Sequence, residues 1–440
     1  MTKKTNICVV GLGYVGLPTA VNFADKGFNV IGVDKNKEIV DMISVGECHL
    51  KDLNIDERLR KVVKNKRLRV STNIVEATKE SDVIIIVVPT PITPDKRPDL
   101  TYIMSAAEDI AKGLNKNKLV ILESTVYPGV TEEVLCPILE KSGLKAGKDF
   151  GVAYCPERYN PGDPNHTIEK VARIVAGINL EWGTKAQKLY QEIVEEVTLV
   201  KNIKTAEAAK VIENVQRDLN IALMNELALI FERFGIDIIE VINAAATKWN
   251  FNVYYPGAGV GGHCLPVDPY YLVKKAEELG FHPKIITAGR DVNDSMPVHV
   301  FELLVDALND CEKSVKNSKI VILGFSYKEN TGDARMSPVE ILVEELKKKN
   351  ANIYIVDPHI EDMFLKKYGK PEKDLYKALE NADAVILMTA HDEFREIDLM
   401  RVKELMTTPI IIDGRRVFDP EKIKKLGFVY RGIGAGGFNK

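Results

Sequence analysis

The segment ICVVGLGYVGLP, residues 7–18, constrains the fold more than any other part of the chain. In it a short apolar strand is followed at once by Gly11, Gly13 and Gly16, and then by a helical pattern. Glycines at this spacing allow a tight turn, close approach of the backbone to a pyrophosphate, and close packing of a helix on a strand. Three glycines in a turn also occur without a ligand, so the interpretation depends on the surrounding sequence.

Asp34 supplies that context, because it directly follows the next apolar strand, 29–33. An acidic side chain there accepts hydrogen bonds from ribose hydroxyls and repels a 2′-phosphate, so the pattern predicts NAD and not NADP. Polar residues in VVPTP and ESTVYPG also follow strand ends, where a doubly wound sheet places ligand contacts. The predicted cofactor contacts in this region are Gly11, Gly13, Tyr14, Val15, Gly16, Asp34, Thr90, Ser124 and Thr125.

Short apolar runs alternate with helical patterns in the first and the last third of the chain. This alternation is typical of a parallel sheet covered by helices on both faces. Asp357 has in the second series the place that Asp34 has in the first. The predicted strands lie at residues 6–10, 29–33, 83–88, 119–122 and 151–154, and then at 319–325, 352–359, 383–390 and 409–415.

One long helix is predicted between the two series. Residues 204–234 contain neither Gly nor Pro, and their apolar positions keep a helical period. At about 1.5 Å per residue this helix would span about 45 Å, enough to join two domains and to serve as a dimer contact. We therefore predict an α/β fold with two Rossmann-like, doubly wound parallel-sheet domains joined by a long central helix, divided at 1–200, 201–300 and 301–440.

The bulk composition excludes several classes of partner. The 440 residues are 45% hydrophobic and 28% charged, the formal net charge is -3, and acidic and basic residues are interspersed. This predicts neither nucleic acid nor an anionic membrane as the main partner. The apolar runs are too short to cross a bilayer, and the segment MTKKTN enters the first strand without a signal-peptide pattern. Six scattered cysteines without a C-x-x-C pair favour a cytoplasmic protein with free thiols over a disulfide framework or a zinc site.

Cys264 differs from the other five cysteines in its surroundings. It lies in PGAGVGGHCLPVD, where four glycines allow the backbone to approach a ligand closely, and Asp268 follows four residues later. A cysteine nucleophile needs partial exposure and neighbours that stabilise the thiolate. His263 is adjacent in sequence, but neighbouring loop residues usually point apart. From the residues alone, both a reactive thiol and a buried structural thiol remain open.

Lys210, Asn214 and Arg217 lie on one face of the predicted long helix, at positions i, i+4 and i+7. Such a face suits either solvent or a set of donors around a reacting oxygen. Glu157, in CPER directly after a strand, is a loop carboxylate that can act as a general base.

In the last third, GFSYKENTGDAR has Lys328, Asp333 and Arg335 where the first turn has phosphate-binding glycines. This replacement predicts a nucleotide bound through side chains, and no second dinucleotide.

The order and spacing of these motifs resemble the UDP-glucose/GDP-mannose dehydrogenase family along nearly the whole chain. The resemblance implies an amino-terminal NAD domain, a central helix that forms a homodimer or higher homo-oligomer, and a carboxyl-terminal domain that binds a UDP-sugar. The matching segments are GLGYVGLP, VVPTP, ESTVYPG, CPER, AEAAKVIENV, GVGGHCLPVDPYYL, GFSYKENTGDAR and DGRR.

The resemblance also implies a two-step oxidation that forms a uronate for surface polysaccharide or glycan synthesis. The C6 alcohol gives a hydride to NAD, Cys264 adds to the aldehyde as a thiohemiacetal, a second NAD takes a second hydride, and the thioester is hydrolysed. No metal is needed, because the nicotinamide carries the redox step and a thioester is already activated.

The roles that the resemblance assigns fall into three groups. The catalytic residues are the nucleophile Cys264, the oxyanion stabilisers Lys210 (also in proton transfer) and Asn214, and Glu157, Thr125 and Asp268 for water and protons. The substrate contacts are Glu157, Arg158, Lys210, Asn214, Arg217, Tyr255, Gly261, Lys328 and Arg415. Arg335 matches a cofactor contact made across a subunit boundary.

The sugar is expected to be a UDP-N-acetylhexosamine. GGHC followed by PVDPYYL, and TKWNF at 247–251, resemble members that act on such sugars, and Arg158 stands where the glucose enzymes have Phe. UDP-ManNAc members tend to carry His-Pro-Arg where this chain has Lys248, Trp249 and Asn250, so the role of that arginine cannot be carried over. We expect UDP-GlcNAc, with UDP-ManNAc as the second choice; UDP-glucose and GDP-mannose are the alternatives within the family.

Two other classes share some of these features. A single-step dehydrogenase of the β-hydroxyacid type has the same first domain, long helix and helical lysine, but it has no use for the GGHC loop or a second α/β domain. A non-catalytic nucleotide-sugar sensor should have lost Lys210, Asn214 or Cys264, and all three are present.

Overall fold

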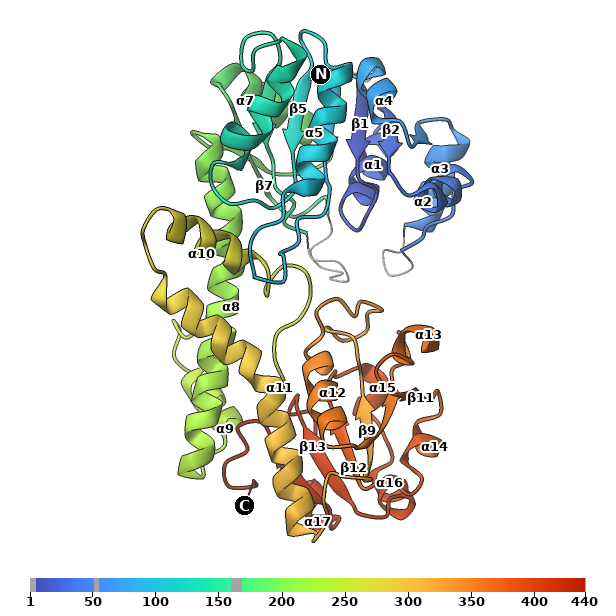
Figure 1. The fold of residues 1–440 in the computed structure, drawn as a ribbon, viewed down its shortest axis with the longest axis vertical. Helices are drawn as coiled ribbons and strands as arrows, with labels where there is room; N and C mark the ends of the chain where they lie inside the picture. Colours follow the sequence, from blue (N-terminus) through green and yellow to red (C-terminus); the bar gives the residue numbers. More distant parts are fainter. Residues whose placement is uncertain (1–4, 51–54, 160–167, 440) are drawn as a thin grey trace. The chain divides into compact units, whose positions relative to one another are not determined.

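The computed structural model describes residues 5–50, 55–159 and 168–439. Two compact units make up the chain: the first contains residues 1–213 and 270–281, and the second contains 214–269 and 282–440 (Figure 1). The first four residues of MTKKTN, for which we predicted the absence of a signal peptide, lie outside the described residues. No helix in the described ranges combines the length and the apolar character that a membrane span requires.

The first unit is built on an eight-stranded sheet in the order β3-β2-β1-β4-β5-β6-β7-β8. Neighbouring strands run parallel except β6 and β7, which are antiparallel. The carboxyl ends of β1, β2, β4, β5 and β6 therefore share one edge, which we call the carboxyl edge. The strands are β1 (Asn6–Val10), β2 (Asn29–Val33), β3 (Leu68–Ser71), β4 (Val83–Ile86), β5 (Leu119–Leu122), β6 (Gly151–Tyr154), β7 (Arg173–Gly177) and β8 (Val197–Leu199).

Helices cover both faces of this sheet because successive side chains of the buried strands point to opposite faces. Helices α1, α3 and α7 pack with Ile7 and Val9 on one face, and α4, α5 and α6 pack with Cys8 and Val10 on the other. The helices are α1 (Gly16–Asp25), α2 (Lys37–Ser44), α3 (Asp56–Lys64), α4 (Ile74–Glu80), α5 (Thr101–Gly113), α6 (Cys136–Leu139) and α7 (Leu180–Tyr190), with a π-helical turn at Thr131–Leu135 and a 3-10 turn at Glu140–Ser142 before and after α6.

The second unit contains a six-stranded parallel sheet in the order β11-β10-β9-β12-β13-β14. Helices α11, α12 and α13 pack on one face of it, and α14 to α17 pack on the other. The strands are β9 (Lys319–Leu323), β10 (Asn352–Val356), β11 (Lys370–Pro371), β12 (Ala384–Leu387), β13 (Ile410–Asp413) and β14 (Val429–Gly432), and the short helices are α12 (Pro338–Lys348), α13 (Asp362–Leu365), α14 (Leu375–Leu379), α15 (Asp392–Arg395), α16 (Leu399–Leu405) and α17 (Pro420–Lys425).

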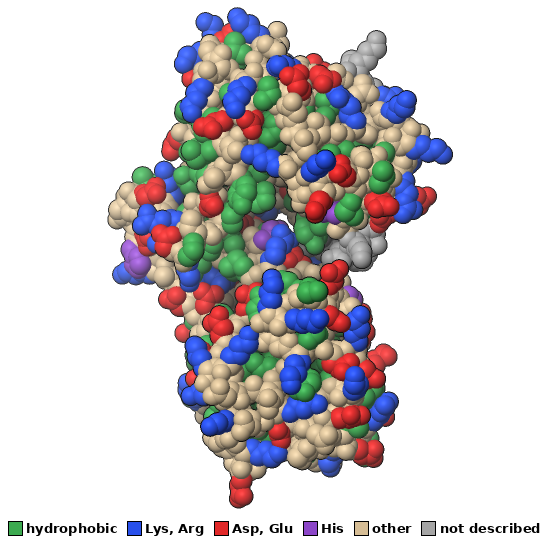
Figure 2. Space-filling view, turned by 45° about the vertical axis from the view of Figure 1, so that its right-hand side comes forward, with side chains coloured by type: hydrophobic (Ala, Val, Ile, Leu, Met, Phe, Trp, Pro, Cys, Tyr) green, Lys and Arg blue, Asp and Glu red, His purple; other side chains and the backbone are tan. Residues whose placement is uncertain are grey.

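The predicted long helix is α8 (Ile203–Phe234), which begins in the first unit and continues in the second. It is followed by α9 (Ile238–Ala245), by α10 (Asp268–Glu278) and by a second long helix, α11 (Lys284–Asp310). The predicted fold class, two Rossmann-like sheets joined by a long central helix, is confirmed; the three-part division at residues 200 and 300 stays a prediction. On the face drawn in Figure 2, basic and acidic side chains alternate.

Candidate active site

The glycine turn after β1 has the backbone geometry that the spacing predicts. Gly11 has a φ of +97°, and a Cβ on it would lie 2.2 Å from the Val87 carbonyl oxygen. A Cβ on Gly16 would lie 1.8 Å from the carbonyl oxygen of Gly11. At Gly13, by contrast, a Cβ would meet no protein atom within 4 Å. Two glycines are therefore required for folding, whereas the third keeps open space beside the backbone.

The first turn of α1 lacks a side-chain cap. Its N-cap residue, Val15, has no side chain that can accept from the free backbone N–H groups. Asp34, which is half-buried at the end of β2, accepts hydrogen bonds from the backbone N–H groups of Leu12 and Asn36, each at 2.9 Å. The Gly16 N–H, which has no acceptor among the described residues, and the fixed Asp34 carboxylate fit the pyrophosphate and a ribose of a dinucleotide.

Three further predicted cofactor contacts lie at the same carboxyl edge. Thr90 and Thr125 are half-buried, in the segments that follow β4 and β5. The Ser124 hydroxyl donates to the Val88 carbonyl at 2.7 Å, so it joins these two segments. The edge thus brings together polar groups from three strand ends.

Glu157 belongs to a buried charge cluster that sequence reasoning missed. Because β7 runs antiparallel to β6, the first residue of β7, Arg173, returns to the edge where Glu157 follows β6. The Arg173 guanidinium pairs with Glu157 and, at 3.0 Å, with Glu123. Glu157 Oε1 also accepts from the backbone N–H groups of Arg158 and Tyr159, each at 2.7 Å.

Glu123 completes this cluster from the end of β5. Burial raises the pKa of Glu123, and the positive charge of Arg173 opposes that rise. The Tyr190 hydroxyl donates to Glu123 at 2.5 Å, and burial raises the pKa of Tyr190 well above its usual value. One guanidinium thus serves two buried carboxylates, and it fixes the position of Glu157.

Two basic residues predicted to contact substrate differ in their surroundings. Lys210 on α8 is 8% exposed, and the described residues offer it no ion-pair partner. Arg158 pairs with Glu213 at 2.8 Å and donates to the Ala172 carbonyl at 2.8 Å. The ammonium of Lys210 is therefore available to a ligand, whereas the guanidinium of Arg158 is already held.

Among the six cysteines, Cys264 and Cys311 are half-buried and the other four are buried. Burial raises the pKa of each of the other five thiols, and for Cys8, Cys136 and Cys155 it raises the pKa to about 12. A raised pKa reduces the thiolate fraction of these five side chains at neutral pH.

The segment around Cys264 is ordered by hydrogen bonds of its own backbone and of α8. The Cys264 carbonyl accepts from the backbone N–H groups of Val267 at 3.0 Å and Asp268 at 2.8 Å. Asp268, the first residue of α10, is 3% exposed and accepts from the Asn214 amide at 2.5 Å. Asn214 and Asp268 are thus in contact, as a shared role requires, while His263 is exposed.

The glycines before Cys264 allow this segment to lie directly on other parts of the second unit. A Cβ on Gly261 would lie 2.7 Å from the Tyr327 side chain, and a Cβ on Gly262 would lie 2.8 Å from the ring of the same tyrosine. The backbone N–H of Gly262 donates to the Arg335 carbonyl at 3.0 Å. The glycine-rich sequence therefore serves close packing against the segment after β9.

The residues predicted to contact the nucleotide are placed as follows. Lys328 is half-buried; Arg335 is exposed and pairs with Asp333 at 2.5 Å. Arg415 donates through Nε to the Met388 carbonyl at 2.7 Å, and burial lowers its pKa. Arg217, which is on α8, is exposed. Tyr255, in the segment that precedes Cys264, is exposed as well.

Comparison with known proteins decides the family. Models of the UDP-glucose/GDP-mannose dehydrogenase family match the chain over its NAD binding domain (residues 5–194), its central domain (204–295) and its UDP binding domain (321–420). The chain belongs to this family. It is therefore an NAD-dependent nucleotide-sugar dehydrogenase.

Relatives within the UDP-glucose/GDP-mannose dehydrogenase family match nearly end to end. A UDP-N-acetyl-D-glucosamine 6-dehydrogenase of Pseudomonas aeruginosa is 41% identical, over 96% of this chain and 99% of its own. A UDP-N-acetyl-D-mannosamine dehydrogenase of Pyrococcus horikoshii is 38% identical, over 98% of this chain and 99% of its own. The solved structure of the P. horikoshii UDP-D-ManNAc dehydrogenase has a TM-score of 0.91 and covers 98% of this chain and 100% of its own.

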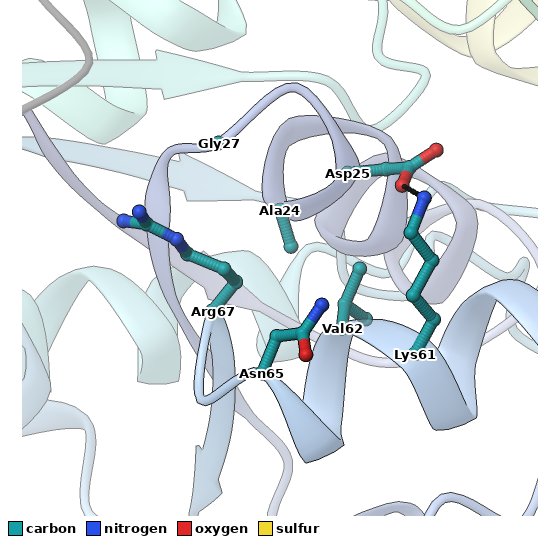
Figure 3. Close-up of a pocket in the computed structure, with 7 residues that line it drawn as sticks. All are labelled: Ala24, Asp25, Gly27, Lys61, Val62, Asn65 and Arg67. Atoms are coloured by element: carbon teal, nitrogen blue, oxygen red, sulfur yellow. Dashed lines mark hydrogen bonds and ion pairs between the residues drawn. The ribbon is translucent and has the colours of Figure 1, made fainter.

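The first unit also contains a hollow of about 420 Å³ that is not part of the candidate active site. Figure 3 shows it between the ends of α1 and α3 and the start of β3, at the edge opposite the carboxyl edge. Its Lys61 is paired with Asp25 at 2.8 Å, and its Arg67 donates to Asn29 at 2.9 Å. The cations in this hollow are thus already engaged.

One group of side chains in the second unit has the composition of a metal site. It consists of His359, His391 and Glu393, whose possible ligand atoms lie within 4.8 Å of one another. His391 accepts from the Asn330 N–H through Nδ1 at 2.9 Å, and its Nε2 lies 3.2 Å from Asp357. Both ring nitrogens are thus engaged, so His391 has no lone pair for a metal.

Proposed function

We propose that this family member oxidises the C6 alcohol of a UDP-N-acetylhexosamine to the carboxylate in two steps, with Cys264 as the nucleophile. The observation that carries the proposal is the contrast among the thiols. Burial raises the pKa of the other five thiols, and four of these are buried, whereas Cys264 is half-buried on a glycine-rich segment tied to Asn214 through Asp268.

Cys264 divides one difficult oxidation into two simpler ones. Its sulfur adds to the aldehyde carbon and forms a thiohemiacetal; oxidation of that carbon gives a thioester, and attack by water expels the thiolate and releases the uronate. When bound, the nicotinamide supplies the redox chemistry by accepting a hydride in each of the two oxidations. The sequence of steps balances as one sugar alcohol, two NAD and one water giving one carboxylate, two NADH and three protons.

Lys210 and Asn214 are the proposed donors to the oxygen that becomes negative. They lie one turn apart on α8, and an ammonium and an amide there stabilise the oxyanion of the thiohemiacetal and of the hydrolysis intermediate. Lys210 is also proposed to serve in proton transfer: as the neutral amine it takes the proton of the C6 alcohol, and the ammonium that forms then stabilises the oxyanion.

Glu157, Thr125 and Asp268 are the proposed groups for the hydrolytic water and its protons. Glu157 is held by Arg173 and by two backbone N–H groups, so its carboxylate has one orientation. Asp268 is held by Asn214 in the same way. Fixed carboxylates at both places orient a water without having to be ordered first.

The proposed substrate contacts are the residues that match substrate contacts of the family. Lys328 and Arg415 are proposed for the diphosphate and uridine end, and Glu157, Arg158, Arg217, Tyr255 and Gly261 for the sugar end. Arg335 is proposed as a cofactor contact from a neighbouring subunit. UDP-GlcNAc is the favoured sugar and UDP-ManNAc the second candidate, because named relatives at 41% and 38% identity act on these two.

The enzyme is proposed to work as a homodimer, or a higher homo-oligomer, through α8. This helix exposes large apolar side chains that a partner would cover. They are Ile212, Leu223, Ile230 and Phe234. We place the enzyme in the cytoplasm, where free thiols stay reduced.

The decisive variant is Cys264→Ala. It should abolish release of the uronate while binding of NAD and UDP persists, because neither ligand depends on the thiol. Cys311→Ala, which removes the other half-buried thiol, is the matched control and should keep full turnover. Undiminished uronate release by Cys264→Ala would overturn the cysteine mechanism.

The sugar is tested by NADH yield with limiting substrate. The panel is UDP-GlcNAc, UDP-ManNAc, UDP-GalNAc, UDP-glucose and GDP-mannose, and the preferred substrate should give two NADH per molecule. A yield of one would indicate a single-step dehydrogenase, and binding without any NADH would indicate a sensor.

A further inference from the structure

The Cys264 loop, which we define as residues 257–268, is attached to α8 at both ends. At its carboxyl end Asp268 accepts from the Asn214 amide at 2.5 Å. At its amino end the backbone N–H of Gly257 donates to the Asn225 side-chain oxygen at 2.9 Å. The two asparagines are eleven residues apart, about three turns and 16 Å along one face of the helix.

Asn225 is fixed in turn by a buried polar chain between α8 and α11, which lie side by side (Figure 1). Its amide donates to Asn293 at 2.8 Å, and the Asn293 amide donates to the Asp218 carboxylate at 2.8 Å. Arg290 donates to the same carboxylate oxygen at 2.6 Å. All four side chains are at most 1% exposed.

Burial of these four polar side chains is energetically unfavourable, so we expect them to do more than fill the core. Each buried polar group loses its hydration, and a group that loses its partner then carries the full desolvation penalty. Apolar residues at these helix positions would pack without that risk, as they do at Ala222 and Met224. What the polar chain provides is one defined acceptor for the backbone of Gly257.

We propose that Asn225 is a positioning residue for Cys264, acting at the end of the loop opposite Asn214. The inference rests on the proposed role of Cys264 as the nucleophile. Between its two anchors the loop rests on Tyr327 through Gly261 and Gly262, so the thiol is placed by three supports in the second unit. Removing the amino-end support lets Gly257 and the glycines after it move, and misplacement of a nucleophile by about 1 Å can cost 100-fold in rate.

Two substitutions and one control test this inference in the full-length protein. Asn225→Ala removes the anchor itself. Asn293→Ala removes the group that fixes Asn225 and a donor to Asp218, and the bond from Gly257 to Asn225 can persist. Asn220→Ala is the matched control, because Asn220 is on the same helix and its amide bonds only to the Gln216 carbonyl.

Hydrogen–deuterium exchange of the Cys264 loop is the first readout. For Asn225→Ala the peptide from 257 to 264 should exchange about tenfold faster while α8 keeps its protection, and Asn293→Ala should have a smaller effect in the same direction. Exchange is independent of the chemistry at Cys264, so this readout stands even if Cys264→Ala were to refute the proposed function. Unchanged exchange in both variants would overturn the inference.

Kinetics provide the second readout. The kcat of Asn225→Ala should fall by about 10- to 100-fold with the KM for NAD unchanged, because the cofactor is bound in the first unit. Asn220→Ala should match the parent. A faster-exchanging loop with an unchanged kcat would also overturn the inference, since the anchor would then not act on the thiol.

A polarity swap separates positioning from general loss of stability. In the double variant Asp218→Asn with Asn225→Asp, the new carboxylate at 225 accepts from Gly257 and from a flipped Asn293 amide, whose oxygen accepts from the new amide at 218. The hydrogen-bond chain is rebuilt with the same net charge, while Arg290 donates to an amide oxygen at 218 and keeps its ion pair with Asp294. The swap should recover at least part of the kcat lost in Asn225→Asp alone; no recovery in a folded double variant would count against the proposal.

Discussion

The two sheets of this protein begin in the same way and then differ. β1 and β9 are each followed by a glycine with positive φ, Gly11 at +97° and Gly324 at +82°. After β1, helix α1 begins at Gly16 without a side-chain cap. After β9, helix α12 begins only at Pro338, and Ser337 caps it by accepting from Val339. In the first turn of α1 the Gly16 N–H has no acceptor among the described residues, whereas at α12 Val339 and Glu340 both donate to Ser337.

The aspartates after the second strand of each sheet differ in the same sense. Asp34 accepts two backbone N–H groups and is half-buried. Asp357 accepts from Phe325 at 2.6 Å, from His359 at 2.8 Å and from the side chain of His391, and it is 8% exposed. The Asp34 carboxylate can still bind a ribose, whereas the Asp357 carboxylate already accepts the hydrogen bonds that hold its own turn. Equivalent positions in one topology thus have different chemistry, depending on which groups the protein itself satisfies.

The largest effect should come from filling the open space at Gly13. Because a Cβ there would meet no protein atom within 4 Å, Gly13→Val is expected to fold. It would occupy the space where a pyrophosphate approaches, so the Kd for NAD should rise by about 100-fold, or roughly 3 kcal/mol. Calorimetric titration measures the Kd for NAD and the Kd for UDP. A Kd for UDP that rose equally would show that the two sheets are not independent sites.

Asp357→Asn should affect stability and not binding. Burial alone would raise the pKa of Asp357, but hydrogen bonds from His391 and from the backbone of Phe325 and Ser326 lower it from 3.8 to about 2. A lowered folded pKa stabilises the protein above the unfolded value and loses this effect as the pH falls through about 2. The parent should exceed the variant by about 2 kcal/mol at pH 6 and by progressively less below pH 4. Urea unfolding across this range measures the difference; a gap that widened in acid would refute it.

Asp34→Ala should affect ligand binding and not stability, the opposite of Asp357→Asn. Loss of the acceptor for the ribose hydroxyls should weaken NAD binding by about tenfold and reduce the preference for NAD over NADP. Binding of UDP should stay the same. The comparison fails if NAD binding is untouched by Asp34→Ala but lost in Asp357→Asn.

The smallest effect is expected at Lys328. This half-buried lysine is proposed to meet the nucleotide as a point charge, so Lys328→Met should weaken UDP binding by about three- to fivefold, and less at high salt. Glu329→Gln, at the next position, is the control and should leave UDP binding unchanged. A loss of NAD affinity in Lys328→Met would mean that the second turn also contacts the cofactor.

The residue patterns predicted most of the fold, because buried parallel strands are continuous apolar runs. The predicted strands at 6–10, 29–33, 119–122 and 151–154 agree with β1, β2, β5 and β6. Strand β3 was missed because LRVS buries only Leu68 fully and therefore has no strong apolar signal. Strand β7 was missed as well; it begins with an arginine.

Motifs could point to side chains that are proposed to meet ligands, but not to the side chains that hold these in position. Cys264, Asn214 and Asp268 stand in recognisable segments, and the last two are in contact. Arg173 has no motif, and only the antiparallel direction of β7 brings it to Glu157. Asn225 is a polar residue that interrupts the apolar stripe of the predicted long helix. That interruption is the signal in the sequence that could have pointed to it.

Anchoring the Cys264 loop at both ends restricts how this enzyme can change during evolution. Twelve residues could reach about 40 Å if extended, yet their attachment points are only about 16 Å apart on a rigid helix. The excess is taken up in glycine turns that rest on Tyr327. A deletion or insertion inside 257–268 would therefore displace the thiol. New substrate preferences are more accessible through residues around the loop than through its length.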